Sequence, residues 1–297
     1  MAKRAVVVSC HGTVEQVEDI PSFVTNIRRG RPAPPEVVAE VTARFQQIGG
    51  SPLMRITHDQ ARALEARLGL PVRACARLWH PYPEAVLAEL AAEGVTEVVS
   101  LPLAPQSVHV YNEVVEKAAA EQGMTTVAAP SYGEEPSLVA AFVSAIEEAR
   151  ARFSPAEQAS LAVILSAHSL PTRVIAMGDP YEKDFRAMAE AVAAALPIPR
   201  ASIHIAFQSQ GMGGGDWLGP DLETTMRGLR DAGIDNLLMA PIGFVAEHVE
   251  TLYDIDIEAR GRAEAMGFAR MERMPAMDCR PAFIDALAEV ATRLLAG

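Results

Sequence analysis

Runs of aliphatic residues with little polar alternation recur along the chain and predict buried β-strands. Strands covered on both faces carry such continuous runs, whereas half-exposed strands alternate apolar and polar residues. The runs lie at Ala5–Ser9, Val72–Arg77, Glu97–Leu101, Thr125–Ala129, Leu161–Ser166, Ser202–Phe207, Asn236–Ala240 and Gly267–Glu272.

Apolar residues at helical spacing separate these runs. They predict amphipathic helices at Ile56–Arg67, Pro83–Ala92, Pro136–Arg152, Tyr181–Ala195, Pro220–Ala232 and Pro281–Leu295. Thr57 is a candidate N-cap for the first helix, and Gln60, three residues later, would complete a capping box. Alternation of strands and helices predicts an α/β fold with parallel sheets and right-handed crossovers.

Two pairs of near-copies indicate an internal duplication. Residues 5–13 read AVVVSCHGT and residues 162–170 read AVILSAHSL, so His11 and His168 follow a buried strand in the same frame. Residues 94–104 (GVTEVVSLPLA) and 233–243 (GIDNLLMAPIG) form the second pair. We predict two doubly wound, Rossmann-like lobes, 1–150 and 151–297, with the final helix packed on the first lobe. Open α/β sheets bind ligands at the carboxyl ends of their strands, so we expect both histidines to face one cleft.

The segment Thr13–Thr57 is rich in proline and glycine and holds most of the early arginines. We interpret it as an insertion in the first lobe that covers the cleft as a lid. The alternative is a surface excursion without a function.

Composition narrows the class of protein. Apolar residues make up 49% and charged residues 22%, which is typical of a globular core. The net charge of −12 argues against a nucleic-acid partner. Cys10, Cys75 and Cys279 lack the spacing of a zinc or iron–sulfur motif, and we expect no disulfide framework. We find neither a signal peptide nor an apolar stretch long enough for a transmembrane segment, so we predict a cytoplasmic protein.

Imidazole and carboxylate groups dominate the candidate chemistry. On a helix, Glu250, Asp254 and Glu258 would lie on one face, with Glu247 close to it. Like charges at this spacing need a cation: an arginine, solvent, or a metal ion held by oxygen ligands. With His168 at a strand tip, this set suits proton transfer and divalent-metal chemistry better than acyl transfer, for which no G-x-S-x-G motif is present.

Four segments, in order over nearly the whole chain, together resemble the ferrochelatase family. They read DIPSFVTNIRRGRP with IGGSPLMRIT, VILSAHSLPTRVIAMGDPY around His168, FQSQGMGGGDWLGPDLETT (207–225) and FVAEHVETLYDIDIE (244–258). The compact bacterial enzymes of the coproporphyrin III type resemble this chain most. The resemblance implies a porphyrin cleft between two Rossmann-like lobes, with porphyrin and Fe²⁺ as substrates. It also implies no tightly bound cofactor, no iron–sulfur cluster, and a monomer with transient contacts to haem-pathway enzymes.

By position, the resemblance assigns His168 and Glu250 to the centre of the macrocycle, as catalytic residues and metal ligands. His168 would accept a pyrrole proton while the lobes distort the ring, and Asp254 and Glu258 would pass metal or protons. The porphyrin-contacting positions are His11, Arg28, Arg44, Phe45, Ser51 and Tyr111.

This chain departs from the family pattern at several of these positions. His11 and Phe45 stand where tyrosine is frequent. Gln106 stands where histidine is usual, in a segment (101–112) that is shorter than its counterparts, which bears on the register of Tyr111.

Two alternatives to a ferrochelatase stay open at this point. One is a chelatase for another tetrapyrrole or metal, such as cobalt into sirohydrochlorin. The other is a non-catalytic haem or porphyrin carrier. Between porphyrins, the arginines permit both coproporphyrin III and protoporphyrin IX, and the compact form favours coproporphyrin III.

Overall fold

The chain divides into two compact units in a computed structural model that describes residues 3–210 and 215–297. Unit 1 comprises Met1–Tyr132, Ala246–Val249 and Asp278–Gly297, and unit 2 comprises Gly133–Val245 and Glu250–Met277. Residues 211–214, part of the segment 207–225, lie outside the described residues.

The division after Tyr132 corrects the lobe boundary that we placed at residue 150. Helix α6 (Pro136–Arg150) packs on α9 (Tyr181–Ala195) of unit 2. At the start of this unit, a Cβ atom on Gly133 would lie 2.8 Å from the Cβ atom of Met188 in α9. The last helix, α13 (Pro281–Ala296), packs on α3 (Leu53–Leu68) within unit 1.

Unit 1 contains a parallel sheet of four strands in the order β2-β1-β3-β4. The strands are β1 (Arg4–Cys10), β2 (Val72–Ala76), β3 (Glu97–Pro102) and β4 (Thr125–Ala128). Ala5 and Val7 pack against α4 (Pro83–Ala92) and α5 (Val108–Glu121), because alternate strand residues face opposite sides of a sheet. The aliphatic runs therefore form the buried central strands that the sequence predicts.

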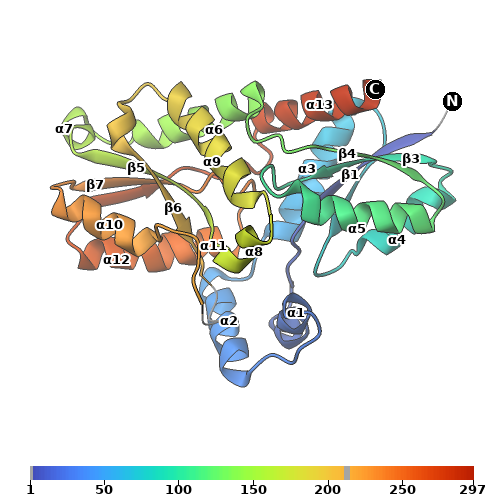
Figure 1. Cartoon of the computed structure of the whole chain (residues 1–297), viewed down its shortest axis with the longest axis horizontal. Coiled ribbons are helices and arrows are strands. Elements are labelled where there is room, and N and C mark those ends of the chain that lie inside the picture. Colours follow the sequence, from blue (N-terminus) through green and yellow to red (C-terminus); the bar gives the residue numbers. More distant parts are fainter. Residues whose placement is uncertain (1–2, 211–214) are drawn as a thin grey trace. The chain divides into compact units, whose positions relative to one another are not determined.

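Unit 2 repeats this order as β6-β5-β7-β8, again with all strands parallel. Its strands are β5 (Leu161–His168), β6 (Ile203–Gln208), β7 (Asn236–Ala240) and β8 (Arg270–Arg273). In Figure 1, α6 and α9 lie on one side of this sheet, and α10 (Leu222–Asp231) and α12 (Arg260–Ala265) on the other. Each strand has its counterpart at the same place in unit 1, so the predicted duplication of α/β lobes is confirmed.

The short elements complete the chain. They are the 3₁₀ helices Val17–Asp19 and Arg200–Ser202, helices α7 (Pro155–Gln158), α8 (Thr172–Ala176) and α11 (Val249–Leu252), and a π-helix at Asp254–Ala259. Within the described residues, no helix has both the length and the hydropathy of a membrane span.

The proline-rich segment 13–57 forms two helices that the sequence analysis did not predict, α1 (Ile20–Ile27) and α2 (Pro35–Ile48). They enclose a small hydrophobic cluster with Phe23, Val24 and Phe45. Whether the segment acts as a lid stays a prediction.

The predicted capping box at Thr57 is wrong. Helix α3 begins after Pro52, one turn earlier, so that Leu53 and Met54 are buried. Thr57 therefore lies inside the helix and donates to the carbonyl of Leu53 (2.8 Å), while Gln60 Nε2 donates to the carbonyl of Asp278 (2.9 Å).

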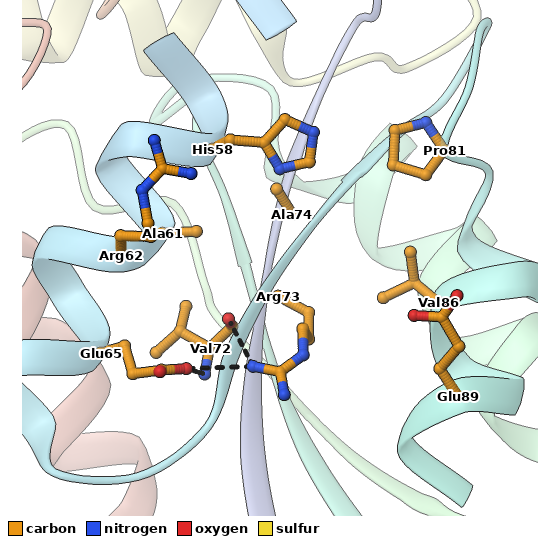
Figure 2. A pocket seen from close by; sticks show the side chains of 10 residues that line it. All are labelled: His58, Ala61, Arg62, Glu65, Val72, Arg73, Ala74, Pro81, Val86 and Glu89. Atoms are coloured by element: carbon orange, nitrogen blue, oxygen red, sulfur yellow. Dashed lines mark hydrogen bonds and ion pairs between the residues drawn. The ribbon is translucent and has the colours of Figure 1, made fainter. Parts of the chain in front are cut away.

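The edge strand β2 borders a groove of about 330 Å³ between α3 and α4, shown in Figure 2. Side chains cover part of the strand edge: Glu65 accepts from the N–H of Val72 (2.9 Å), and Arg73 donates to the carbonyl of Val72 (3.2 Å). The N–H of Ala76 donates to the carbonyl of Pro81 (2.7 Å). Occupied edge groups protect a sheet against pairing with another chain, so we assign this groove a structural role.

Candidate active site

His168 is the last residue of β5, where the buried run Leu161–Ala167 reaches the end of the sheet. The hydroxyl of Tyr181 donates to its backbone carbonyl (2.8 Å). Its Nδ1 contacts the carbonyl oxygen of Ser169, which can only accept, so the ring proton belongs on Nδ1 in this arrangement. The lone pair is then on Nε2, which lies 3.8 Å from Oε1 of Glu250.

Glu250 enters the site from the first turn of α11, which follows β7 in the sequence. Its side chain is 26% exposed and that of His168 is 34% exposed, so both are half-buried. The side chain of Gln208 donates to the backbone carbonyl of Glu250 (3.0 Å) and accepts from Ser166 Oγ (2.8 Å). Side chains from β5 and β6 thereby fix the backbone that carries this carboxylate.

The other acidic residues do not form the single row predicted for a continuous α-helix. A π-helix begins at Asp254, and the N–H of Glu258 donates to the carbonyl of Tyr253 (2.9 Å), five residues earlier. Asp254 is buried and accepts from Ser209 Oγ, whereas Glu258 forms an ion pair with Arg262 (2.8 Å). The cation beside Glu258 is therefore an arginine, one of the three that the sequence left open, and its role in passing metal or protons stays a prediction. Single π turns occur frequently at functional sites.

His11 directly follows β1 in unit 1 and is exposed. Its ring lies edge-on to Phe23, with the two ring centroids 6.3 Å apart. The next residue, Gly12, has a φ of 93°, and a Cβ atom there would lie 2.9 Å from the Cβ atom of Ala76. The backbone of this turn therefore requires glycine.

The remaining predicted porphyrin contacts all belong to unit 1. Arg28 follows α1, and Arg44 on α2 pairs with Glu40 (2.6 Å). Phe45 is 3% exposed within the α1–α2 cluster, so its side chain packs that segment. Ser51 lies between α2 and α3, and Tyr111 is buried on α5. Their contacts with a porphyrin stay predictions.

The cysteines are poor candidates for chemistry. Burial raises the pKa of the Cys10 and Cys75 thiols, and partial burial with nearby Asp59 and Asp278 raises that of Cys279. Thiols with a raised pKa are poor nucleophiles. Over residues 3–210 and 215–297, no three His, Cys, Asp or Glu side chains are grouped to hold a metal ion.

Sequence reasoning missed the polar groups that organise the site, namely Gln208, Ser209 and Tyr181. A signal was present, because the dipeptide Gln208-Ser209 follows an aliphatic run directly, as His168 does. The residues that Gln208 contacts can be identified only once the pairing of β5 and β6 is known.

A family model described as Ferrochelatase matches residues 3–295. The chain belongs to the ferrochelatase family. It is 37% identical to the ferrochelatase of Acidobacterium capsulatum, over 97% of this chain and 94% of that protein. It is 35% identical to the coproporphyrin III ferrochelatase of Bacillus subtilis, over 99% of this chain and 98% of that protein. These matches confirm the resemblance stated above and identify an enzyme that acts as a metal chelatase.

Solved structures show the same fold at low identity. SirB from Bacillus subtilis with Fe³⁺ aligns with a TM-score of 0.62 and 14% identity, over 98% of this chain and 95% of that one. CbiX, described as the terminal enzyme of sirohaem biosynthesis in denitrifying bacteria, aligns with a TM-score of 0.56 and 13% identity, over 98% of both chains. At such identities the likeness concerns the fold, so the ferrochelatase assignment is better supported than the sirohydrochlorin alternative.

Proposed function

We propose that this ferrochelatase inserts Fe²⁺ into coproporphyrin III during haem biosynthesis and releases two protons. The observation that carries the proposal is the pair formed by His168 Nε2 and Glu250 Oε1, 3.8 Å apart at the end of β5. Membership of the family supplies the reaction class, and the B. subtilis relative supports the choice of porphyrin.

The two pyrrole protons need an acceptor as the metal enters the ring. His168 Nε2 is the candidate base, because Nδ1 is engaged by the carbonyl of Ser169. An imidazole is the side chain most often used for proton transfer near neutral pH. The neighbouring Glu250 carboxylate would stabilise the imidazolium that forms.

Glu250 has a second candidate role, as a ligand of the incoming ion. A carboxylate beside an imidazole is a ligand set that suits Fe²⁺. Asp254, which accepts from Ser209, lies one helical turn further along the chain and would pass metal or protons toward Glu250. Glu258 is the weakest candidate, because Arg262 already neutralises its charge.

Recognition of coproporphyrin III would rest on its propionates, which outnumber those of protoporphyrin IX. Arg28 and Arg44 are the candidate partners, since a guanidinium group matches a carboxylate in shape and charge. A hydrogen bond to a charged group contributes about 1.5–3 kcal/mol. One additional arginine–propionate pair would therefore change kcat/KM by about tenfold or more.

Anaerobic steady-state iron insertion with each porphyrin tests this proposal. We expect a higher kcat/KM for coproporphyrin III, and a smaller preference in Arg28→Gln. Arg67→Gln is the matched control, because Arg67 pairs with Asp285 within unit 1. Equal rates, or faster turnover of protoporphyrin IX, would contradict the choice of porphyrin. Activity only with Co²⁺ and sirohydrochlorin would contradict the proposed reaction.

We also propose that the enzyme acts in the cytoplasm as a monomer, without a tightly bound cofactor or iron–sulfur cluster. It would have transient contacts with other haem-pathway enzymes. The small number of cysteines, two of them buried, supports the absence of a cluster. Light scattering, iron analysis of the purified protein and cell fractionation would test these points separately.

A further inference from the structure

Gln208 connects the two residues of the candidate active site. It is the last residue of β6, is 4% exposed, and pairs with His168 in the β5–β6 ladder. Its backbone carbonyl accepts from the N–H of Ser169 (2.7 Å). The backbone of Gln208 therefore holds the strand end that carries His168.

The side chain of Gln208 holds the other residue of the pair. Its Nε2 donates to the carbonyl of Glu250 (3.0 Å), and its Oε1 accepts from Ser166 Oγ (2.8 Å). The carbonyl of Glu250 can only accept, so the NH₂ group must point toward it, and the two bonds define one orientation of the amide. A buried amide satisfied at both ends is rigid, and it locates the Glu250 backbone relative to β5.

Because the fold is duplicated, unit 1 shows whether the sheet needs a glutamine at the position of Gln208. In the sheets, Ser9 of unit 1 pairs with Cys75, and Ser166 of unit 2 pairs with Ala206. Gln208 lies two residues after Ala206, so its counterpart in unit 1 is Arg77, two residues after Cys75. In the described part of the chain, Ser9 Oγ is buried without a hydrogen-bond partner. The same sheet thus forms without the glutamine, and the fold alone does not require it.

We propose that Gln208 is a positioning residue, which sets the place of the Glu250 carboxylate relative to His168 and thereby the use of Fe²⁺. The inference rests on the proposed function of this site. Side chains that orient metal ligands typically change metal affinity or activity about 10- to 100-fold when they are replaced. The effect should fall on the metal, because the side chain of Gln208 donates to Glu250, the candidate metal ligand.

Gln208→Met tests the proposal, because methionine is of similar length and lacks the amide. We expect kcat/KM for Fe²⁺ to fall about 10- to 100-fold, with the KM for porphyrin near that of the wild type. Gln208→Glu should show a similar loss, because it keeps an acceptor for Ser166 and lacks the donor to Glu250. Glutamate is closer than methionine to glutamine in shape, so Gln208→Glu tests the proposal if Gln208→Met does not fold.

Gln158→Met is the matched control. Gln158 accepts from Arg150 (2.5 Å) and donates to the carbonyls of Arg150 (3.3 Å) and Phe153 (3.0 Å), just before β5 begins. The variant loses side-chain amide hydrogen bonds, as Gln208→Met does, but at the opposite end of the strand that carries His168. Its kcat/KM for Fe²⁺ should stay near that of the wild type.

A double-mutant cycle separates positioning from a general effect on the fold. Added to Glu250→Gln, Gln208→Met should cause no further loss of the single-turnover rate, because the carboxylate it positions is gone. Losses that multiply would overturn the inference, as would wild-type kinetics of Gln208→Met and Gln208→Glu. Wild-type protein that does not insert iron would instead overturn the proposed function.

Discussion

The ends of β1 and β5 have nearly the same sequence and the same place in their sheets, but they differ in what surrounds the histidine. At β5, His168 lies beside the carboxylate of Glu250. The side chain of Gln208 joins Ser166 to the backbone carbonyl of Glu250 by two hydrogen bonds. At β1, His11 lies edge-on to the ring of Phe23.

The residues after the two histidines differ in the same way. Gly12 is required by the close approach of Ala76, whereas Ser169 is buried and donates to the carbonyl of Leu218 (2.9 Å). The residue after the histidine is thus set by close packing in unit 1, whereas it donates a side-chain hydrogen bond in unit 2. The duplicated α/β frame thus supplies equivalent positions in both units, and we propose that the side chains of unit 2 supply the chemistry.

After the loss of His168 itself, the largest effect within unit 2 should come from Glu250→Gln, which removes the charge beside His168. We expect the rate of iron insertion to fall about 100-fold or more, the range for losing a group that takes part in proton transfer. Glu258→Gln should have a much smaller effect, because Arg262 neutralises that carboxylate. Stopped-flow measurement of the iron-insertion rate in both variants checks this. Equal losses of rate would indicate that Glu250 and Glu258 act together, as the sequence predicted.

Gly243→Ala should disturb the β5 tip through packing. A Cβ atom at Gly243 would lie 2.4 Å from the Cβ atom of Ala167, next to His168. Overpacking of this kind destabilises by about 1–3 kcal/mol. The control is Gly228→Ala on α10, where nothing lies within 4 Å of the added atom and the free energy of unfolding should not fall. Denaturant unfolding measures the free energy of unfolding of the two variants. An unchanged value for Gly243→Ala would show that the end of β5 can shift to accommodate the added methyl group.

Ser166→Ala and Ser9→Ala compare the two frames directly. Ser166→Ala leaves the buried Oε1 of Gln208 without its donor and should cost about 1–3 kcal/mol. Ser9→Ala removes a hydroxyl that has no partner among the described residues and should be neutral or stabilising. Unfolding free energies in urea measure both, and equal losses would argue against a special network in unit 2.

The smallest effect concerns pH. Burial, followed by the charge of Arg200, lowers the pKa of His204 on β6 below 6.5. Between that folded-state pKa and 6.5 the unfolded chain binds more protons, so stability falls as the pH decreases through this window. Arg73, at the matching place in unit 1, pairs with Glu65 (3.0 Å). His204→Asn should flatten the pH dependence of the unfolding free energy, and an unchanged profile would contradict this cause.

The sequence predicted the positions of the strands well, because β1, β3, β5 and β7 are buried and their aliphatic runs are continuous. The expected burial does not hold for the edge strands β4 and β8, which are partly exposed. Asn236–Ala240 and two helices, Pro83–Ala92 and Tyr181–Ala195, have the predicted bounds. The helices of the segment 13–57 were missed, because its prolines and glycines lie at helix ends: Pro35 begins α2 and Gly49 ends it with a φ of 72°.

For the site, the strand position selected His168, and the helical spacing selected Glu250 only as one of several carboxylates. The resemblance to the ferrochelatase family singled out these two as a pair. The role of Gln208 could not be predicted, because it depends on which residue of β6 lies beside His168. The separate surroundings of Asp254 and Glu258 depend on a π turn, for which we identified no signal in the sequence.

We propose that the chemistry depends on the histidine of unit 2, although both units carry one in the same frame. Single-turnover insertion of Fe²⁺ by His168→Ala and His11→Ala, in one assay against the wild type, tests it most directly. We expect a loss of about 100- to 10,000-fold for His168→Ala and a clearly smaller loss for His11→Ala. An equal loss in both variants, or a greater loss in His11→Ala, would contradict it.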